Sequence, residues 1–422
     1  SLFAMRLIYL MLIHRETIYL EKTTGFNRPC RVYSSALCER EANLERMSVL
    51  VNSSEISSMC LSNRDHRVVD ISLLQKQSHL PSEFIWPKDD LVHHLDKLHE
   101  PVIDLGGFLQ GDEAATAQAV HHIRRACSTH GFFQVTNHGV NPDLVRAAYH
   151  ASESIFNLPL AKKRSASRKP GSVTGYSGAH ADRYSSKLPW KETFSFQFIG
   201  KEGDDNREVV PYFKSALGEE FTLAGSVFQN YCQAMKKMSL QIFELLAISL
   251  GLKPSGYRKF FEDGESIMRC NLYPPCNDSN STLGTGPHSD PNVLTILHQD
   301  QVGGLEVLVN NNWRAVRPRQ DCFVVNIGDT FMAAANGVYK SCLHRAVVNR
   351  TTERRSLVYF VCPRGDKIVR PPEDLVAREG RRNYPDFTWS ELLEFTQNHY
   401  RVDVATLETF VPWLLANNYA TP

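Results

Sequence analysis

The sequence has little of what marks a secreted, membrane-spanning or nucleic-acid-binding protein. Its ten cysteines are scattered and form no Cys-x-x-Cys pair, so no disulfide framework is indicated and a reducing, cytoplasmic compartment is the simpler interpretation. The formal net charge of +1 offers no electrostatic footprint for nucleic acid. The most lipid-like run, Leu7 to Ile13, is seven residues long, well below the roughly twenty that span a bilayer. We therefore expect neither nucleic-acid nor membrane partners.

The first sixty or so residues differ in character from the rest of the chain. They mix short apolar runs with Arg and Glu and show no sustained helical or strand period, which predicts a weakly ordered leader over 1–62. The sequence begins with Ser1, and Met47 offers an alternative start. On that interpretation 1–46 would not belong to the native protein, although a targeting role for this stretch stays open.

After the leader, short apolar runs and helical periods divide the chain into regions. With 422 residues and 42% hydrophobic content, the chain can bury a large core. The β-rich region contains short runs such as Leu305 to Val309 and Phe323 to Ile327, separated by Gly, Pro and Asn. This pattern predicts an α+β fold with a double-stranded β-helix (jelly-roll) core flanked by helices. The expected regions are a mixed helical and strand region over 63–215, a long supporting helix within 216–262, the jelly roll over 263–365 and a helical segment over 366–422.

Local signals predict several individual elements. Asn141 followed by Pro142 is typical of a helix start, because an Asn side chain caps the free N–H groups and proline suits the first helical turn. The stretch from Lys162 to Ser186, rich in Ser, Arg, Lys and Gly, indicates a loop. Apolar residues at helical spacing predict a long helix from about Glu219 to Leu250.

His288, Asp290 and His344 together fit a single metal site. Residues two apart in an extended strand point to the same side, so His288 and Asp290 can reach one ion while Ser289 faces away. His344 would complete the site from another strand. Two imidazoles and one carboxylate on one face of a metal leave the opposite face open, which is the arrangement of non-heme Fe(II) oxygenases. These three residues are our predicted metal ligands.

A second His-x-Asp triplet lies nearby at His298 and Asp300. The first triplet follows a predicted loop from Gly284 to Pro287, which places it at the mouth of a cavity, whereas the second ends the apolar run Val293 to Leu297. We therefore prefer the first triplet as the source of ligands, and interpret His298 and Asp300 as structural polar residues or part of a cavity rim.

Two further pairs with a spacing of two suit the recognition of an anionic ligand. An arginine fork at Arg354 matches a carboxylate, and the hydroxyl of Ser356 can donate a third hydrogen bond. Asn271 and Tyr273 share one strand face just before a Pro-Pro sequence ends the strand. Taken one by one, these residues suit an ordinary ion pair, a cap or core packing. Their combination and order favour a binding role.

The run from about Pro101 to Trp413 resembles the plant 2-oxoglutarate- and Fe(II)-dependent dioxygenases, and among them most closely the gibberellin 20-oxidases. The resemblance implies Fe(II) at the predicted triad, 2-oxoglutarate and O2 as cosubstrates, and ascorbate as reductant. It also implies that Arg354, Ser356, Tyr273 and Asn271 hold 2-oxoglutarate. We further expect a monomer. The stretches that carry the resemblance are LPWKET at 188–193, NLYPPC at 271–276, LTILHQDQVGG at 294–304 and KSCLHRAVVN at 340–349.

The resemblance also implies a diterpenoid substrate, a twenty-carbon gibberellin that is oxidised stepwise to a nineteen-carbon product. Such a molecule has apolar rings and at least one carboxylate, so its site needs apolar walls and a cation. In 188–193, Trp190 would supply a flat wall, Lys191 a carboxylate partner and Thr193 a hydrogen-bond donor. The alternative is a structural strand in which Trp190 belongs to the core and Lys191 is solvated.

Some positions depart from the pattern of the family. The family usually has a second tyrosine where this chain has Leu272, and serine and arginine near Ala335 and Val338. None of these is a predicted ligand, so the departures concern substrate preference or catalytic rate. Two alternatives stay open: a sister dioxygenase, such as a gibberellin 3-oxidase, a 2-oxidase or a flavonoid dioxygenase, and a non-catalytic jelly roll that binds a ligand.

Overall fold

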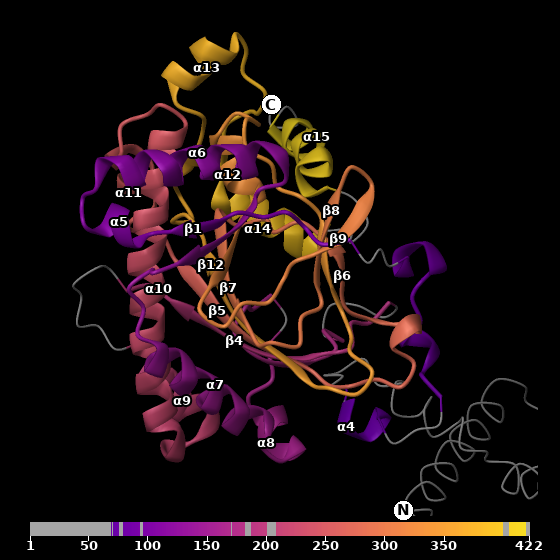
Figure 1. Ribbon diagram of the computed structural model, residues 1–422. Helices are drawn as coiled ribbons and strands as arrows, with labels where there is room; N and C mark the ends of the chain where they lie inside the picture. The colour runs from indigo at the N-terminus through magenta and orange to yellow at the C-terminus, as the bar shows by residue number, and fades with distance from the viewer. Residues whose placement is uncertain are drawn as a thin grey trace, which may run out of the picture. The chain divides into compact units, whose positions relative to one another are not determined.

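Two β-sheets face each other in the computed structural model (Figure 1). Side chains from both sheets line an interior cavity. The structure describes residues 69, 71–75, 79–92, 96–169, 171–181, 187–200, 208–399 and 405–418. The predicted leader over 1–62 and the alternative start at Met47 lie outside these residues. The described residues belong to one unit of the chain, which begins at Asp65.

The larger sheet has eight strands in the order β1-β2-β10-β7-β12-β5-β4-β3. Its neighbouring strands are antiparallel, apart from the parallel pair of β1 and β2. The strands are β1 (Val102–Asp104), β2 (Phe132–Thr136), β3 (Gly175–Gly178), β4 (Glu192–Phe198), β5 (Ser266–Tyr273), β7 (Leu294–Gln299), β10 (Phe323–Ile327) and β12 (Arg354–Val361).

The smaller sheet has the order β6-β11-β8-β9 and closes the other side of the cavity. These two sheets form the double-stranded β-helix that the sequence predicts, with helices around it. The strands of the smaller sheet are β6 (Leu283–His288), β8 (Leu305–Val309), β9 (Asn312–Ala315) and β11 (His344–Val347), and a separate two-stranded ladder pairs β13 (Ile368–Val369) with β14 (Phe387–Thr388).

Helices cover the outer face of the larger sheet. The longest, α10 (Thr222–Ser249), runs along that face and contacts β7 and β12 as well as four neighbouring helices (Figure 1). The remaining α-helices are α4 (Ile71–Leu74), α5 (Gly106–Leu109), α6 (Glu113–Thr129), α7 (Pro142–Phe156), α8 (Leu160–Ser165), α9 (Val209–Leu217), α11 (Ser255–Phe261), α12 (Asp329–Ala334), α13 (Glu373–Glu379), α14 (Trp389–Asn398) and α15 (Thr406–Asn418). The 3-10 turns are η1 (Ser82–Phe84), η2 (Lys88–Leu91), η3 (Glu219–Phe221) and η4 (Ser279–Ser281).

Alternation along the central strands separates the core from the cavity. In β5, Met268 and Cys270 point outward into the hydrophobic core shared with α10, whereas Arg269, Asn271 and Tyr273 line the cavity. Successive residues of a strand point to opposite faces of a sheet, so β5 contributes side chains both to the hydrophobic core and to the cavity. The same geometry applies to the neighbouring strands, which therefore carry the predicted site residues on one face.

The structure confirms two of the predicted helices and the local interactions from which they were predicted. The side chain of Asn141 accepts a hydrogen bond from the backbone N–H of Asp143, and Pro142 is the first residue of α7. The long helix predicted from about Glu219 to Leu250 is α10, preceded by the turn η3. Both predictions rested on local signals that the tertiary structure leaves unchanged.

Two loop predictions are wrong. The stretch from Lys162 to Ser186 contains the end of α8 and the strand β3. The stretch Gly284 to Pro287 lies inside β6. Proline is tolerated there because β6 is an edge strand, and a Cβ atom at Gly284 would lie 2.5 Å from the ring of Tyr273. Glycine is therefore required at this position because an aromatic ring packs closely against the strand. It does not mark a turn.

The predicted division into regions stays a prediction. Strands from 63–215 and from 263–365 lie in the same sheet. Among the described residues, no helix is both long enough and apolar enough to cross a membrane.

Candidate metal centre

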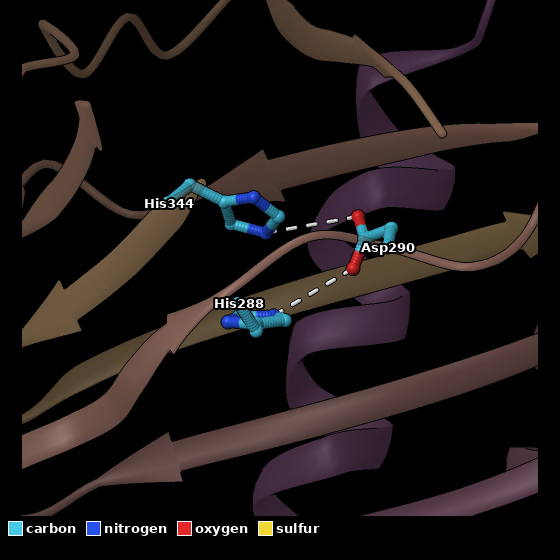
Figure 2. A group of neighbouring side chains, drawn as sticks. All are labelled: His288, Asp290 and His344. Atoms are coloured by element: carbon cyan, nitrogen blue, oxygen red, sulfur yellow. Dashed lines mark ion pairs between the residues drawn. The ribbon is translucent and has the colours of Figure 1, made fainter. Parts of the chain in front are cut away.

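The three predicted metal ligands converge on one point of the cavity (Figure 2). His288 ends β6, Asp290 follows in the loop, and His344 begins β11 directly opposite His288. One nitrogen or oxygen atom from each side chain lies within 4.8 Å of the others. The pairing of the end of β6 with the start of β11 therefore brings His288 and His344 together, although they are more than fifty positions apart in sequence.

Backbone hydrogen bonds set which imidazole nitrogen faces the metal position. The Nδ1 atom of His288 lies 2.9 Å from the carbonyl oxygen of Gly286, and that of His344 lies 3.3 Å from the carbonyl oxygen of Cys342. A carbonyl only accepts, so each Nδ1 carries the proton and each Nε2 presents its lone pair. The Nε2 atoms lie 3.6 Å and 3.7 Å from the carboxylate oxygens of Asp290.

The protonation states of these groups also suit a metal. Burial lowers the pKa of His288 below its usual value, and the neighbouring His344 lowers it further. Burial alone would raise the pKa of Asp290, but the two histidines and hydrogen bonds from Asn326 and Thr295 lower it. A neutral imidazole at His288 beside an ionised carboxylate at Asp290 is a combination that binds a divalent cation.

Two side chains fix the carboxylate of Asp290. Its Oδ2 atom accepts hydrogen bonds from Thr295 Oγ1 at 2.7 Å and from Asn326 Nδ2 at 2.9 Å. Ligating carboxylates are commonly held in this way, which fixes their orientation. The set of two nitrogen donors and one oriented oxygen donor fits Fe(II), with positions left for cosubstrates on the cavity side.

The second His-x-Asp triplet has structural partners. The Nδ1 atom of His298 lies 3.0 Å from the hydroxyl of Tyr149, and its Nε2 atom lies 3.1 Å from the carbonyl oxygen of Gln320. The carboxylate of Asp300 accepts hydrogen bonds from the backbone N–H groups of Val302 and Arg355. Within the described residues these two side chains belong to no three-membered metal cluster, so the interpretation as structural polar residues is favoured.

The four residues predicted to hold a carboxylate ligand lie on one face of the larger sheet. Arg354 pairs with Tyr273, and Ser356 pairs with Asn271 on one side and Gln299 on the other. Directly opposed residues share a face. The guanidinium of Arg354 lies 4.9 Å from the ring centroid of Tyr273, and the amide nitrogen of Asn271 donates to Ser356 Oγ at 3.1 Å.

Several polar atoms at this end of the cavity are buried without a hydrogen-bond partner. Arg354 is 2% exposed and donates to Gln299 Oε1 at 3.0 Å, but its Nε atom has no partner. Nor have Asn271 Oδ1 and Gln299 Nε2. No described carboxylate forms an ion pair with Arg354. A buried guanidinium without an anion is costly, so this end of the cavity fits the carboxylate of a ligand.

The structure separates the three residues predicted to bind the main substrate. Trp190 is packed edge-on against Phe84 at 5.2 Å, and its indole nitrogen donates to the carbonyl of Pro274, so it is a core residue and does not line the metal cavity. Thr193 is fully buried and donates to the carbonyl of Ser177. Trp190 instead lines a separate pocket of about 420 Å³ together with Leu74, Pro275 and Arg350, so its role as a wall of the substrate site stays a prediction.

Lys191 does line the metal cavity. Its ammonium donates to Thr285 Oγ1 at 3.0 Å, and the side chain is 3% exposed. Burial lowers the pKa of Lys191 well below its usual value, and the nearby Arg269 and Arg168 lower it further. The alternative interpretation expected Lys191 to be exposed to solvent. That expectation is wrong, because the side chain is buried in the cavity wall.

Sequence reasoning missed two other polar residues of the site, of which Arg269 lines the cavity. Arg269 and Gln299 have polar side chains on the same sheet face as Asn271. Arg269 was within reach of sequence analysis, because it stands two positions before Asn271 in the same strand. Gln299 was not, because only the register of β7 against β12 places it beside Ser356.

Two family models match the chain. Residues 264–363 match the 2OG-Fe(II) oxygenase superfamily. Residues 101–213 match the N-terminal region described as that of the non-haem dioxygenase in morphine synthesis. The first match contains the whole triad and Arg354.

Relatives and solved structures also resemble this chain over most of its length. The chain is 51% identical over 348 residues to gibberellin 20 oxidase 2 of Arabidopsis thaliana, covering 82% of this chain and 90% of the relative. It is 53% identical over 342 residues to gibberellin 20 oxidase 2 of Oryza sativa subsp. indica, covering 81% and 87%. The crystal structure of JOX2 in complex with 2OG, Fe and JA matches with a TM-score of 0.70 and 29% identity, covering 82% of this chain and 98% of that one.

Proposed function

The chain belongs to the gibberellin 20-oxidase family of the 2OG-Fe(II) oxygenases, and from this premise we propose that it oxidises twenty-carbon gibberellins stepwise to nineteen-carbon gibberellins. It is a 2-oxoglutarate-dependent dioxygenase. The observation that supports its cosubstrate most directly is the buried guanidinium of Arg354, which has no described carboxylate partner and lines the same cavity as the metal triad.

We propose specific roles for the residues of the cavity. His288, Asp290 and His344 would hold Fe(II), which together with 2-oxoglutarate and O2 supplies the oxidant that removes hydrogen from the substrate. Arg354 and Ser356 would bind the distal carboxylate of 2-oxoglutarate. Tyr273 and Asn271 would complete that subsite, the tyrosine by packing on the guanidinium and the asparagine by positioning Ser356.

The size of the cavity limits how the gibberellin can bind. The space beside the triad measures about 60 Å³, whereas sites for ligands of drug size measure roughly 300–1,000 Å³. The iron and the cosubstrate would occupy the space that is present. The space beside the triad therefore holds a diterpenoid only if side chains of the cavity wall move. We propose that Lys191 in this wall meets a carboxylate of the gibberellin, because an incoming anion would stabilise the charged form of lysine that burial disfavours.

Lys191→Met should raise the gibberellin concentration needed for half-maximal turnover and spare the slow turnover of 2-oxoglutarate without gibberellin. Methionine keeps most of the unbranched side chain but removes the amino group, whose hydrogen bond to a carboxylate is worth about 1.5–3 kcal/mol. Steady-state assays with and without gibberellin measure the two effects.

The matched control is Lys236→Met. Lys236 is also buried, but it lies on α10 and donates to the carbonyl oxygens of Phe261 and Gly264. This change should lower stability without altering the requirement for gibberellin. Equal increases in the requirements for gibberellin and 2-oxoglutarate in Lys191→Met would count against a role for Lys191 in gibberellin recognition.

We also propose a monomer that acts in the cytoplasm with ascorbate as its reductant. The seven cysteines that the structure describes are all free thiols, which supports a reducing compartment. Sedimentation of the purified protein would test the monomer.

The proposed reaction is tested by its products. The protein would be incubated with Fe(II), 2-oxoglutarate, ascorbate and a panel of gibberellins, and the products identified by mass spectrometry. We expect twenty-carbon gibberellins to be converted to nineteen-carbon lactones, with one succinate formed in each oxidation step. Hydroxylation of nineteen-carbon gibberellins alone, with the twenty-carbon forms unchanged, would instead indicate a 3-oxidase or a 2-oxidase.

A further inference from the structure

The residue between the first two ligands takes part in a buried polar contact on the far side of the metal loop. Ser289 Oγ donates to Asp329 Oδ2 at 2.9 Å and lies 3.2 Å from Thr406 Oγ1. All three side chains are at most 2% exposed. Asp329 begins α12 and Thr406 begins α15, so the contact joins the metal loop to two helices, one of them near the C-terminus.

Hydrogen bonds to backbone carbonyl groups also join the start of α12 to the same loop. The N–H group of Asp329 donates to the carbonyl oxygen of Asp290 at 2.8 Å, and Thr330 Oγ1 donates to the carbonyl oxygen of Pro291 at 2.6 Å. A Cβ atom at Gly328 would lie 2.0 Å from the carbonyl oxygen of Asn292. The loop that carries Asp290 is thus fixed from the side opposite the metal.

The apolar contacts of α15 are separate from this polar contact. Phe410 packs edge-on against Phe387 at 5.2 Å, and Trp413 lies 5.3 Å from Phe395 of α14. These aromatic side chains pack the helix on its neighbours. The hydroxyl of Thr406 adds to these apolar contacts a buried polar contact with the metal loop.

We propose that α15 positions the metal ligand Asp290, with Thr406 acting through Ser289 and Asp329. The proposal rests on the iron site described above. A ligand in a loop has more conformational freedom than one in a strand, and ordering it before the metal arrives removes that entropic cost from binding. Groups that hold metal ligands from behind commonly change metal affinity by about 10- to 100-fold when they are replaced. Thr406 and Asp329 are thus positioning residues.

The decisive measurement is the affinity of the full chain for Fe(II), obtained without O2 by competition with a chelator. Thr406→Val keeps the shape of the side chain but removes the hydroxyl, and should weaken Fe(II) binding about tenfold. Thr406→Ser retains the hydroxyl and should restore the affinity. Thr409→Val is the matched control, because the hydroxyl of Thr409 on the same helix donates only to the carbonyl oxygen of Thr406.

A second variant separates positioning from loss of folding. Ser289→Ala removes the same contact from the side of the loop, so it should weaken Fe(II) binding by a similar factor. If the two hydroxyls act as one unit, the double variant should lose little more affinity than either single variant. The visible spectrum of bound Co(II), which reports the geometry of the ligands, should change in Thr406→Val and stay unchanged in Thr409→Val.

Fe(II) affinity and a Co(II) spectrum in Thr406→Val equal to those of Thr409→Val would overturn the proposal. Fully additive losses in the double variant would also overturn it, because they would show that the two hydroxyls act independently. Failure of the unaltered chain to bind Fe(II) would instead contradict the proposed dioxygenase function.

Discussion

Replacement of His288, Asp290 or His344 by alanine should abolish iron retention and turnover of gibberellin. Each side chain supplies one donor atom, and the three atoms lie within 4.8 Å of one another. With one donor removed, two protein ligands compete poorly with water for a divalent ion. Loss of Asp290 also removes the carboxylate that balances part of the charge of the metal. Iron content after gel filtration and succinate formation measure the two effects.

His298→Ala is the matched control for these three changes. His298 belongs to the other His-x-Asp triplet, and both of its ring nitrogens already have hydrogen-bond partners in Tyr149 and the backbone of Gln320. Its loss should lower the free energy of unfolding and leave iron bound. Retention of iron in His288→Ala with loss of iron in His298→Ala would reverse the assignment of the two triplets.

Arg354→Ala should raise the dissociation constant of 2-oxoglutarate by roughly ten- to a hundred-fold. A hydrogen bond to a charged group is worth about 1.5–3 kcal/mol, and each 1.4 kcal/mol corresponds to about a factor of ten in affinity. The requirement for gibberellin should change far less, because the guanidinium lies at the end of the cavity beside Asn271 and Tyr273 and donates to Gln299. Binding of 2-oxoglutarate to the iron-loaded protein without O2 isolates this effect from turnover.

The neighbouring Arg355 provides a control of the same residue type. Its side chain points to the other face of the sheet and forms ion pairs with Glu153 and Glu353 at 3.2 Å and 2.6 Å. Arg355→Ala should therefore leave 2-oxoglutarate binding unchanged. An unchanged dissociation constant in Arg354→Ala would show that another cation of the cavity, Lys191 or Arg269, holds the cosubstrate.

The parts of the fold that the sequence predicted are those set by local geometry. The cap at Asn141 and the period of α10 depend on contacts within a few residues. The spacing of His288 and Asp290 likewise fixes their relative direction before any strand pairs. Such features can be predicted from a short stretch of sequence, because they depend only on the backbone conformation of one element.

The parts that the sequence could not settle depend on partners far along the chain. Within 188–193, Trp190 packs into the core while Lys191 enters the cavity, and only the position of that stretch against β6 and the end of β5 decides which is which. The stretch Gly284 to Pro287 is a strand because β11 pairs with it, although its residues are typical of a loop.

The sequence by itself determined the chemistry of this protein, and the tertiary structure decided which residues surround that chemistry. Donor types and their spacing along a strand already specify a facial metal site and an arginine for a carboxylate. Strand register then placed Gln299 beside Ser356, and helix packing placed Thr406 behind Ser289. Those contacts join residues 57 and 117 positions apart, and no local pattern can specify them, because each depends on the packing of whole elements.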